Sequence, residues 1–212
     1  KNRADLNPLG SAAGYGTPGL DLDRDSTRQK LGFAKNHEPI TAVQLSRGKA
    51  EATLIFEITL LLGDLGRLAS DLLLFYTDEF AFVSLPENMT TGSSIMPQKR
   101  NPDFAELARG KTGRVIGNLV GMLTVLKGLA LTYNLDLQED KEGFFDSADT
   151  LLSTLEAFTS IVSTLKVDKQ RACDLSNGGQ MLATDLADYL VIKGMPFRQA
   201  HGIIKELCQY AL

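Results

Sequence analysis

Residues 90–103 bring hydroxyl, amide and cationic side chains together between two long apolar stretches. The segment reads Thr-Thr-Gly-Ser-Ser-Ile-Met-Pro-Gln-Lys-Arg-Asn-Pro-Asp. Gly92 and the prolines at 97 and 102 exclude a continuous helix, so these polar groups are expected on a loop. Lysine offers a point charge, and serine, asparagine and backbone amides donate hydrogen bonds, as a carboxylate ligand requires. Composition alone leaves two interpretations equally open: a binding site for an anionic substrate, and a polar connection.

A helix is expected to begin directly after this loop. Asp103 or Asn101 can cap it, because short polar side chains accept hydrogen bonds from the first free amides of a helix. Those amides and the helix dipole favour a negative ligand. The loop and the helix that follows therefore predict one anion-binding region.

Proline positions indicate which elements carry this loop. The seven prolines stand at 8, 18, 39, 86, 97, 102 and 196, which leaves residues 40–85 and 103–195 free of proline. The first stretch predicts a helix from about Ser46 to Tyr76, roughly 45 Å long at 1.5 Å per residue. Its expected apolar face consists of Leu54, Ile58, Leu61, Leu65, Leu68 and Leu72, widened by Leu62, Ala69 and Leu73.

The second stretch predicts two further helices, with a break around residues 132–140. Leu107, Val115, Leu119, Met122 and Leu126 suit the first, and Phe144, Ala148, Leu151, Leu155, Phe158 and Val162 suit the second. Glycines at 113, 117 and 121 recur every four residues. Close approach of a packed helix would use them, and simple tolerance of glycine is the alternative.

The fold predicted is an all-α bundle of unusually long helices, followed by the start of a small C-terminal helical domain. Residues 1–40 are expected to form a loop-rich linker with a short helix, residues 41–172 the bundle with the loop at 88–103, and residues 173–212 part of the small domain. In that domain Gly178-Gly179 interrupts the pattern, a short helix fits residues 185–193, and Gly194 with Pro196 separates two helices. The apolar surface of the first long helix is too wide for one neighbour, which predicts oligomerisation.

Composition narrows the classes of partner. A formal charge of −4 gives no surplus of basic residues for a nucleic acid. Cys173 and Cys208 lie far apart without metal-ligand spacing, which favours a reducing compartment and two core thiols. Acidic and basic residues interrupt the longest apolar stretch and the N-terminus is polar, so we expect no membrane span, no signal peptide and a cytoplasmic protein.

The run from Gly92 to Asp103 resembles the signature loop of the fumarase and aspartase superfamily, lyases that release fumarate from succinyl compounds. Five further segments, at residues 126–129, 132–134, 136–142, 181–187 and 194–201, narrow the resemblance to the argininosuccinate lyase family. The resemblance runs from Pro8 almost to the end of the chain. It implies cleavage of argininosuccinate to arginine and fumarate, a step of arginine biosynthesis, without a metal or organic cofactor.

The resemblance also assigns roles to individual residues. Ser93 matches the catalytic base, Lys99 and Asn101 match residues that hold the succinyl carboxylates, and Glu106 matches the acidic partner of a catalytic histidine. Ser94 is grouped with the substrate-binding residues as support for the loop. Tyr133, Gln138 and Lys141 match residues that hold the arginine-like end of the substrate. Arg100 stands where the family more often has lysine, which keeps the charge but changes the geometry.

Members of the family are homotetramers whose active sites draw on three subunits, so the resemblance implies an incomplete site in one chain. It also implies an N-terminal domain, with the catalytic histidine, that has no counterpart here. His37 is expected to be an exposed loop residue and His201 a helix residue, and neither matches that histidine. Two alternatives stay open: another fumarate-releasing lyase of the superfamily, and a catalytically silent helical scaffold or inactive fragment, as some lens crystallins are.

Overall fold

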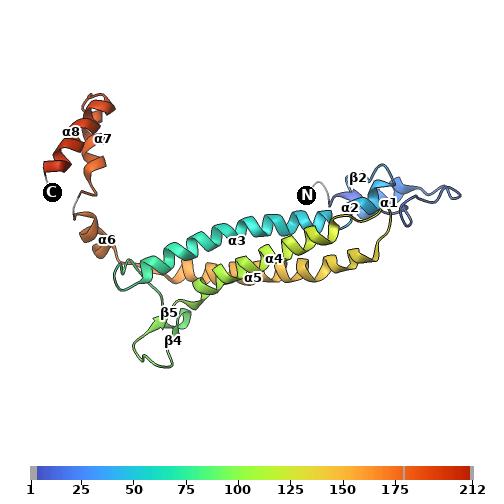
Figure 1. Ribbon diagram of the computed structural model, residues 1–212, viewed down its shortest axis with the longest axis horizontal. Helices are drawn as coiled ribbons and strands as arrows, with labels where there is room; N and C mark the ends of the chain where they lie inside the picture. The colour runs from blue at the N-terminus through green and yellow to red at the C-terminus, as the bar shows by residue number, and fades with distance from the viewer. Residues whose placement is uncertain (1–3, 179, 211–212) are drawn as a thin grey trace. The chain divides into compact units, whose positions relative to one another are not determined.

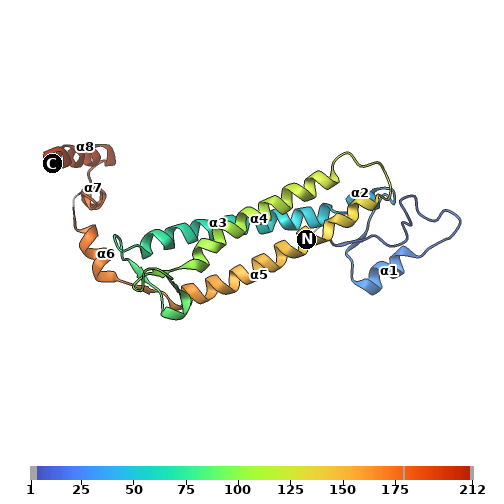
Figure 2. The same cartoon turned by 60° about the horizontal axis from the view of Figure 1, so that its bottom comes forward.

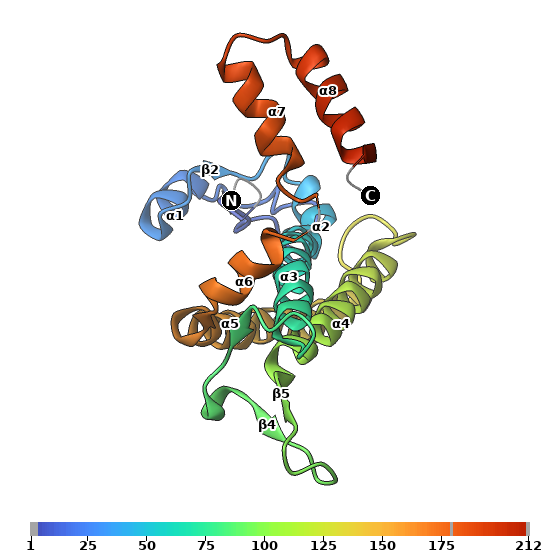
Figure 3. The ribbon, with the colours of Figure 1, turned by 90° about the vertical axis from the view of Figure 1, so that its left-hand side faces the viewer.

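Three long helices dominate the computed structural model, which describes residues 4–178 and 180–210. They are α3 (Lys49–Tyr76), α4 (Asp103–Leu126) and α5 (Asp140–Thr164), and they run side by side (Figure 1, Figure 2). Figure 3 views them from one end. This confirms the predicted fold of unusually long helices. The chain divides into two compact units, residues 1–73 with 87–163, and residues 74–86 with 164–212, and each is described by itself.

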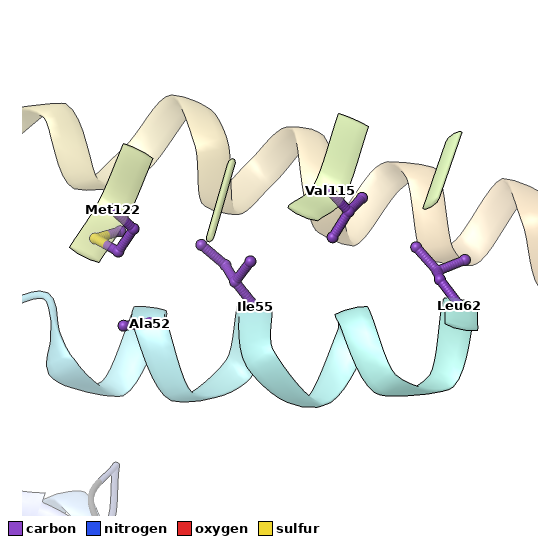
Figure 4. Close-up of a cluster of buried hydrophobic side chains, with 5 residues drawn as sticks. All are labelled: Ala52, Ile55, Leu62, Val115 and Met122. Carbon is purple, nitrogen blue, oxygen red and sulfur yellow. The ribbon is translucent and has the colours of Figure 1, made fainter. Parts of the chain in front are cut away.

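The core of the first unit lies between α3 and α4. Ile55, Leu62 and Ala69 recur every seven residues and form one buried stripe on α3. Ile55 and Leu62 pack in one cluster with Val115 and Met122 of α4 (Figure 4). Each fully buried aliphatic side chain of this kind contributes about 1.5–3 kcal/mol. The cluster holds α3 and α4 together along much of their length.

The predicted apolar face of α3 was partly wrong. Leu54, Leu61 and Leu68 form a stripe of their own at the same seven-residue spacing, but they are 43%, 42% and 39% exposed. The reason is that the apolar surface of α3 is wider than the side that its neighbours in this chain cover. Leu107 of α4 and Val162 of α5, also expected in the core, are exposed as well.

The contact between α4 and α5 is more polar than the sequence suggested. Arg114 on α4 lies 3.0 Å from a carboxylate oxygen of Asp146 on α5. The amide of Asn118 donates to the same carboxylate at 2.8 Å and to the hydroxyl of Ser147 at 3.1 Å. Buried polar groups must be paired, so these bonds fix how α5 is aligned along α4.

The glycines of α4 meet no neighbour within the chain. Among the described residues, nothing lies within 4 Å of a Cβ built at Gly113, Gly117 or Gly121. Close approach of a second helix, one of the two interpretations of their spacing, is therefore not realised inside this chain.

The N-terminal segment is more ordered than a linker. It contains a parallel pairing of β1 (Leu6–Asn7) with β2 (Lys35–Asn36), the helix α1 (Arg24–Leu31), which Asp23 caps, and the short α2 (Ala42–Ser46). Asn7 is fully buried and bonds to Arg24 and Asn36. The Arg24 guanidinium in turn donates to the carbonyls of Leu9 and His37. These bonds tie residues 6–9 to residues 24–37.

The second unit is built from short elements. β3 (Val83–Ser84) pairs antiparallel with β6 (Lys166–Val167), and three helices follow: α6 (Lys169–Ser176), α7 (Ala183–Ile192) and α8 (Phe197–Tyr210). The helix expected at 185–193 and the break at Gly194 are both present, and α7 and α8 form a hairpin (Figure 3). Gly178 follows α6, whereas Gly179 lies outside the described residues.

Both cysteines belong to this second unit, and neither is a core thiol as expected. Cys173 is exposed and Cys208 is half-buried. Helix α6, which carries Cys173, buries none of its side chains, so it offers no core for a thiol. Within the residues that the structure covers, no helix is both long and apolar enough to cross a membrane.

Candidate active site

A small hairpin forms the polar loop between the long helices. It starts after a short 3-10 helix, η1 (Glu87–Met89), and pairs β4 (Thr91–Gly92) antiparallel with β5 (Arg100–Asn101). The amide of Ser93 donates to the carbonyl of Lys99 at 3.3 Å, which closes the neck of the loop. Ser93 and Lys99 therefore face each other where the loop leaves the hairpin.

The hydroxyl of Ser93 accepts two backbone hydrogen bonds. The amides of Ile95 and Met96 donate to its Oγ at 3.2 Å and 3.1 Å. Backbone amides aimed at one oxygen stabilise negative charge on that oxygen without having to reorganise. The loop can therefore support an ionised form of the Ser93 hydroxyl.

Two side-chain contacts anchor the base of the hairpin. The hydroxyl of Thr91 hydrogen-bonds to the carboxylate of Asp103, and Arg100 forms an ion pair with Glu87. Arg100 thus has a local partner in η1. These contacts connect the hairpin to the start of α4 and to η1, and they restrict the position of the loop relative to both.

The expected cap of α4 was wrong. Pro102 occupies the N-cap position, where its side chain offers no acceptor. Asp103 is already the first residue of the helix, and its carboxylate accepts from Thr91, whereas Asn101 belongs to β5. The amides of the first turn of α4 therefore gain no side-chain cap from either residue.

Five of the residues singled out from the sequence gather at this end of α4. They are Ser93, Ser94, Lys99 and Asn101 of the hairpin and Glu106 in the first turn of the helix. Ser94, Lys99 and Glu106 are exposed, and Ser93 and Asn101 are half-buried. Two serine hydroxyls, an amide, a lysine and a glutamate thus lie within a short stretch of the chain. These groups are suited to moving a proton beside a bound carboxylate.

Tyr133, Gln138 and Lys141 form a second group on the connection between α4 and α5. Gln138 lies in the 3-10 helix η2 (Leu135–Glu139), and its amide donates to the Tyr133 hydroxyl at 3.5 Å. Lys141, in the first turn of α5, lies 2.8 Å from Asp140 and 3.6 Å from Glu51 of α3. A hydrogen bond thus joins Gln138 to Tyr133, and two carboxylates hold Lys141, which follows Gln138 by three residues.

The two groups lie beyond opposite ends of α4. This helix has 24 residues, so about 36 Å separate its ends at 1.5 Å per residue. Figure 1 and Figure 2 show β4 and β5 at one end of the three helices and the α4–α5 connection at the other. The chain does not bring the hairpin group and the Tyr133 group to one place.

The two histidines belong to different units of the chain, His37 to the first and His201 to the second. His37 is half-buried, and its Nδ1 lies 3.4 Å from the hydroxyl of Ser46, so the expectation of an exposed loop residue was wrong. His201 is on α8, as expected for a helix residue, with its ring 6.1 Å from that of Phe197. Among the described residues, no cluster of three or more His, Cys, Asp or Glu side chains is arranged to hold a metal ion.

Two residues beside the Tyr133 group were missed from the sequence. Arg47, at the end of α2, places its guanidinium 5.5 Å from the centre of the Tyr133 ring. Asp140 is fully buried next to Lys141. Asp140 stands inside the segment 136–142 that carried the family resemblance, but nothing in the sequence distinguished it from its acidic neighbours. No local signal connected Arg47 with a segment about 90 residues away.

Comparison with known proteins identifies the family. A family model described as Lyase matches residues 1–117, and a model described as Argininosuccinate lyase C-terminal matches residues 180–212. The argininosuccinate lyase of Lactococcus lactis subsp. cremoris is 50% identical over 96% of the chain, and that of Caldicellulosiruptor bescii is 47% identical over 97%. The chain spans 44% of the length of each of these curated relatives.

Solved structures agree with this assignment. An EDDS lyase variant with bound fumarate superposes with a TM-score of 0.84 and 32% identity, over 99% of this chain and 41% of that one. A class II fumarase from Schistosoma mansoni shares the fold, with a TM-score of 0.77 and 19% identity over 99% of this chain and 48% of the fumarase. The chain therefore belongs to the lyase family, and it is similar to the argininosuccinate lyases over almost its whole length.

Proposed function

We propose that the protein carrying this chain is an argininosuccinate lyase, which eliminates fumarate from argininosuccinate and releases arginine. The observation that carries the proposal is the identity of 46–50% to curated argininosuccinate lyases over almost the whole chain. The hairpin geometry supports it, because its serine, lysine and asparagine side chains suit a substrate with carboxylates.

In the proposed reaction Ser93, as its alkoxide, removes a proton from the carbon beside a succinyl carboxylate. The electron pair left on that carbon forms the double bond of fumarate, the carbon–nitrogen bond breaks, and an acid protonates the departing guanidinium nitrogen. The amides of Ile95 and Met96 support the ionised serine. Lys99 and Asn101 hold the carboxylates and lower the cost of the negative charge that develops beside them.

The remaining residues take supporting roles in this proposal. Glu106, one turn into α4, is the acidic partner of a histidine supplied from outside this chain's described residues. Ser94 supports the loop. Tyr133, Gln138 and Lys141 hold the arginine-like end of the substrate. The chain needs no metal or organic cofactor for these steps, because the charge is handled by protein groups alone.

The working form proposed is a homotetramer in which each active site takes its hairpin and its Tyr133 group from different subunits. The separation of the two groups by the length of α4 supports this. So does the exposed leucine stripe of α3, because apolar surface of that extent is normally covered. A cytoplasmic location, and the absence of nucleic-acid and membrane partners, belong to the same proposal.

A second substrate deserves a direct comparison. An EDDS lyase variant that superposes on this chain is 32% identical to it and has bound fumarate. The second candidate substrate is therefore a succinyl compound that carries a different amine. A silent helical scaffold is the other alternative. Retention of Ser93, Lys99, Asn101 and Glu106 favours a working enzyme over a scaffold.

The test is fumarate release, followed by ultraviolet absorbance. The protein expressed from its full reading frame is supplied with argininosuccinate, with EDDS, or with adenylosuccinate, after its mass has been measured. Release from argininosuccinate alone would support the proposal, and release mainly from another substrate would replace it. Absence of release from all three by an intact, folded tetramer would leave the scaffold interpretation.

A further inference from the structure

A fully buried carboxylate lies under the Tyr133 group. Asp140 is the first residue of α5, and its side chain is completely inaccessible. In the part of the chain that the structure describes, neither of its oxygens has a hydrogen-bond partner in good geometry. A buried, ionised carboxylate is costly unless cations compensate it. Two cations do so: Lys141 at 2.8 Å, close but not oriented as a hydrogen bond, and Arg47 at 3.7 Å.

Arg47 connects this carboxylate to the residues proposed to hold the arginine-like end of the substrate. Its Nε faces Asp140, its Nη2 donates to the carbonyl of Leu137 at 3.4 Å, and its guanidinium lies over the ring of Tyr133. One planar cation therefore contacts a buried anion, the backbone of η2 and an aromatic face. These contacts determine where Tyr133 lies, and Gln138 is bonded to the Tyr133 hydroxyl.

The backbone is arranged to bring Arg47 to this position. Gly48 follows it with φ +76°, a left-handed conformation that L side chains rarely adopt. A Cβ at Gly48 would lie 2.7 Å from Cδ2 of Leu126, at the end of α4, and 3.7 Å from Leu137. Glycine therefore suits both the left-handed turn that follows Arg47 and the close approach of this turn to Leu126.

We propose that Arg47, held by Asp140, is a positioning residue that sets the affinity for the arginine-like end of the substrate. The inference rests on the proposed function and adds residues to it. Arg47 acts through Tyr133 and through the backbone of η2. It has no role at the hairpin, which lies beyond the other end of α4.

Arginine cannot be replaced by lysine in this role. The guanidinium is flat and presents several donors, so it can stack on Tyr133 while it faces Asp140 and Leu137, whereas an ammonium group is a single point charge. Arg47→Lys keeps a positive charge beside the buried Asp140, so the variant should still fold. It removes the stacking on Tyr133 and the hydrogen bond to the carbonyl of Leu137 in η2. It is therefore the informative variant, and Asp140→Asn is the second, because it removes the charge that holds Arg47.

The experiment compares two inhibitors, free arginine and succinate, each of which resembles one end of the substrate. For the wild type, Arg47→Lys and Asp140→Asn, each expressed from the full reading frame, we would measure kcat, KM for argininosuccinate, and the inhibition constants of free arginine and of succinate. The matched control is Arg28→Lys, whose guanidinium pairs with the exposed Asp25 on α1. Thermal melting verifies that every variant folds.

For both test variants we expect KM and the arginine inhibition constant to rise by about tenfold, the factor that corresponds to about 1.4 kcal/mol. The succinate inhibition constant stays within about twofold of wild type, as do all constants of the control. A merely structural role would lower the amount of active enzyme and leave both inhibition constants unchanged, and that result for Arg47→Lys overturns the inference. A wild type that releases no fumarate overturns the proposed function instead.

Discussion

Ser93 and Tyr133 lie beyond opposite ends of the same helix, α4, whose 24 residues keep them apart. About 36 Å of helix cannot be spanned by one molecule of argininosuccinate, whose two ends these residues are proposed to bind. The two groups can serve one substrate only if different subunits supply them. The long helices thus position two half-sites, the hairpin with Ser93 and the group with Tyr133. Assembly of several subunits would bring the two half-sites of different chains together.

Removing the Ser93 hydroxyl should abolish catalysis without unfolding the protein. Because Ser93→Ala removes the proposed base, we expect kcat to fall by about 10²–10⁴-fold, the range for a lost general base. The loop keeps its backbone pairing, so the melting temperature should stay close to that of the wild type. Ser176→Ala, which removes a hydroxyl bonded only to the carbonyl of Cys173 on α6, is the control. Equal loss of activity in both variants would rule out a special role for Ser93.

The hydrogen bond between Thr91 and Asp103 should contribute to kcat and should not affect binding of the arginine-like end of the substrate. Thr91→Val removes a hydrogen bond to a charged group, worth about 1.5–3 kcal/mol, and frees one anchor of the hairpin. We expect kcat to fall by about tenfold, since about 1.4 kcal/mol corresponds to a factor of ten. The inhibition constant of arginine should not change. Thr27→Val on α1 is the matched control, and a rise in the arginine constant would contradict the assignment of the two ends.

A charge on the exposed stripe of α3 should break the assembly. Leu61 is 42% exposed in the single chain, and we expect a subunit contact to cover it. Leu61→Glu should therefore give a smaller species in light scattering, with its helix content retained and its lyase activity lost. Leu31→Glu on α1, 57% exposed, should leave the mass unchanged. A Leu61→Glu protein of wild-type mass would show that this stripe is not an interface.

The close approach at Gly48 can be tested against a second glycine of similar conformation. Gly48 and Gly128 have φ values of +76° and +70°, but only Gly48 has a neighbour that a Cβ would strike, Leu126. Gly128→Ala should cost about 1–2 kcal/mol of the free energy of unfolding, for the left-handed backbone alone. Gly48→Ala should cost more than Gly128→Ala, but by less than the penalty of about 1–3 kcal/mol for a rigid overpacked core, because the atom it meets, Cδ2 of Leu126, is the end of a flexible side chain. Chemical denaturation of both variants measures the difference, and equal losses would remove the steric part of the argument.

The sequence predicted the long helices well because their signals are local. Proline-free stretches of helical periodicity placed a helix at about 46–76, where α3 covers Lys49–Tyr76, and a break at 132–140, where η2 covers Leu135–Glu139. The buried face of α3 could not be chosen, because the helix carries more than one apolar stripe at the same seven-residue spacing. Which stripe is buried depends on α4, which periodicity within α3 does not describe.

The sequence could propose the members of the candidate site, but not how they are arranged in space. The loop sequence identified Ser93 and Lys99 together, and the structure keeps them at one neck. Arg47 could not be found, because its contacts with Tyr133 and Asp140 join segments about 90 residues apart. The cap of α4 was wrong for a related reason: Asp103 is bonded to Thr91, a partner that only the hairpin pairing reveals.

The most direct test of the account is complementation between two inactive variants. Ser93→Ala and Lys141→Met each disable a different end, and we would coexpress them with two different tags and isolate the hybrid tetramers. If the two half-sites come from different subunits, some hybrid sites combine an intact Ser93 with an intact Lys141, and activity should return to about a quarter of wild type for random assembly. Each variant alone should stay inactive. Isolated hybrids that release no fumarate would show that both ends of a site come from one chain, and would contradict the account.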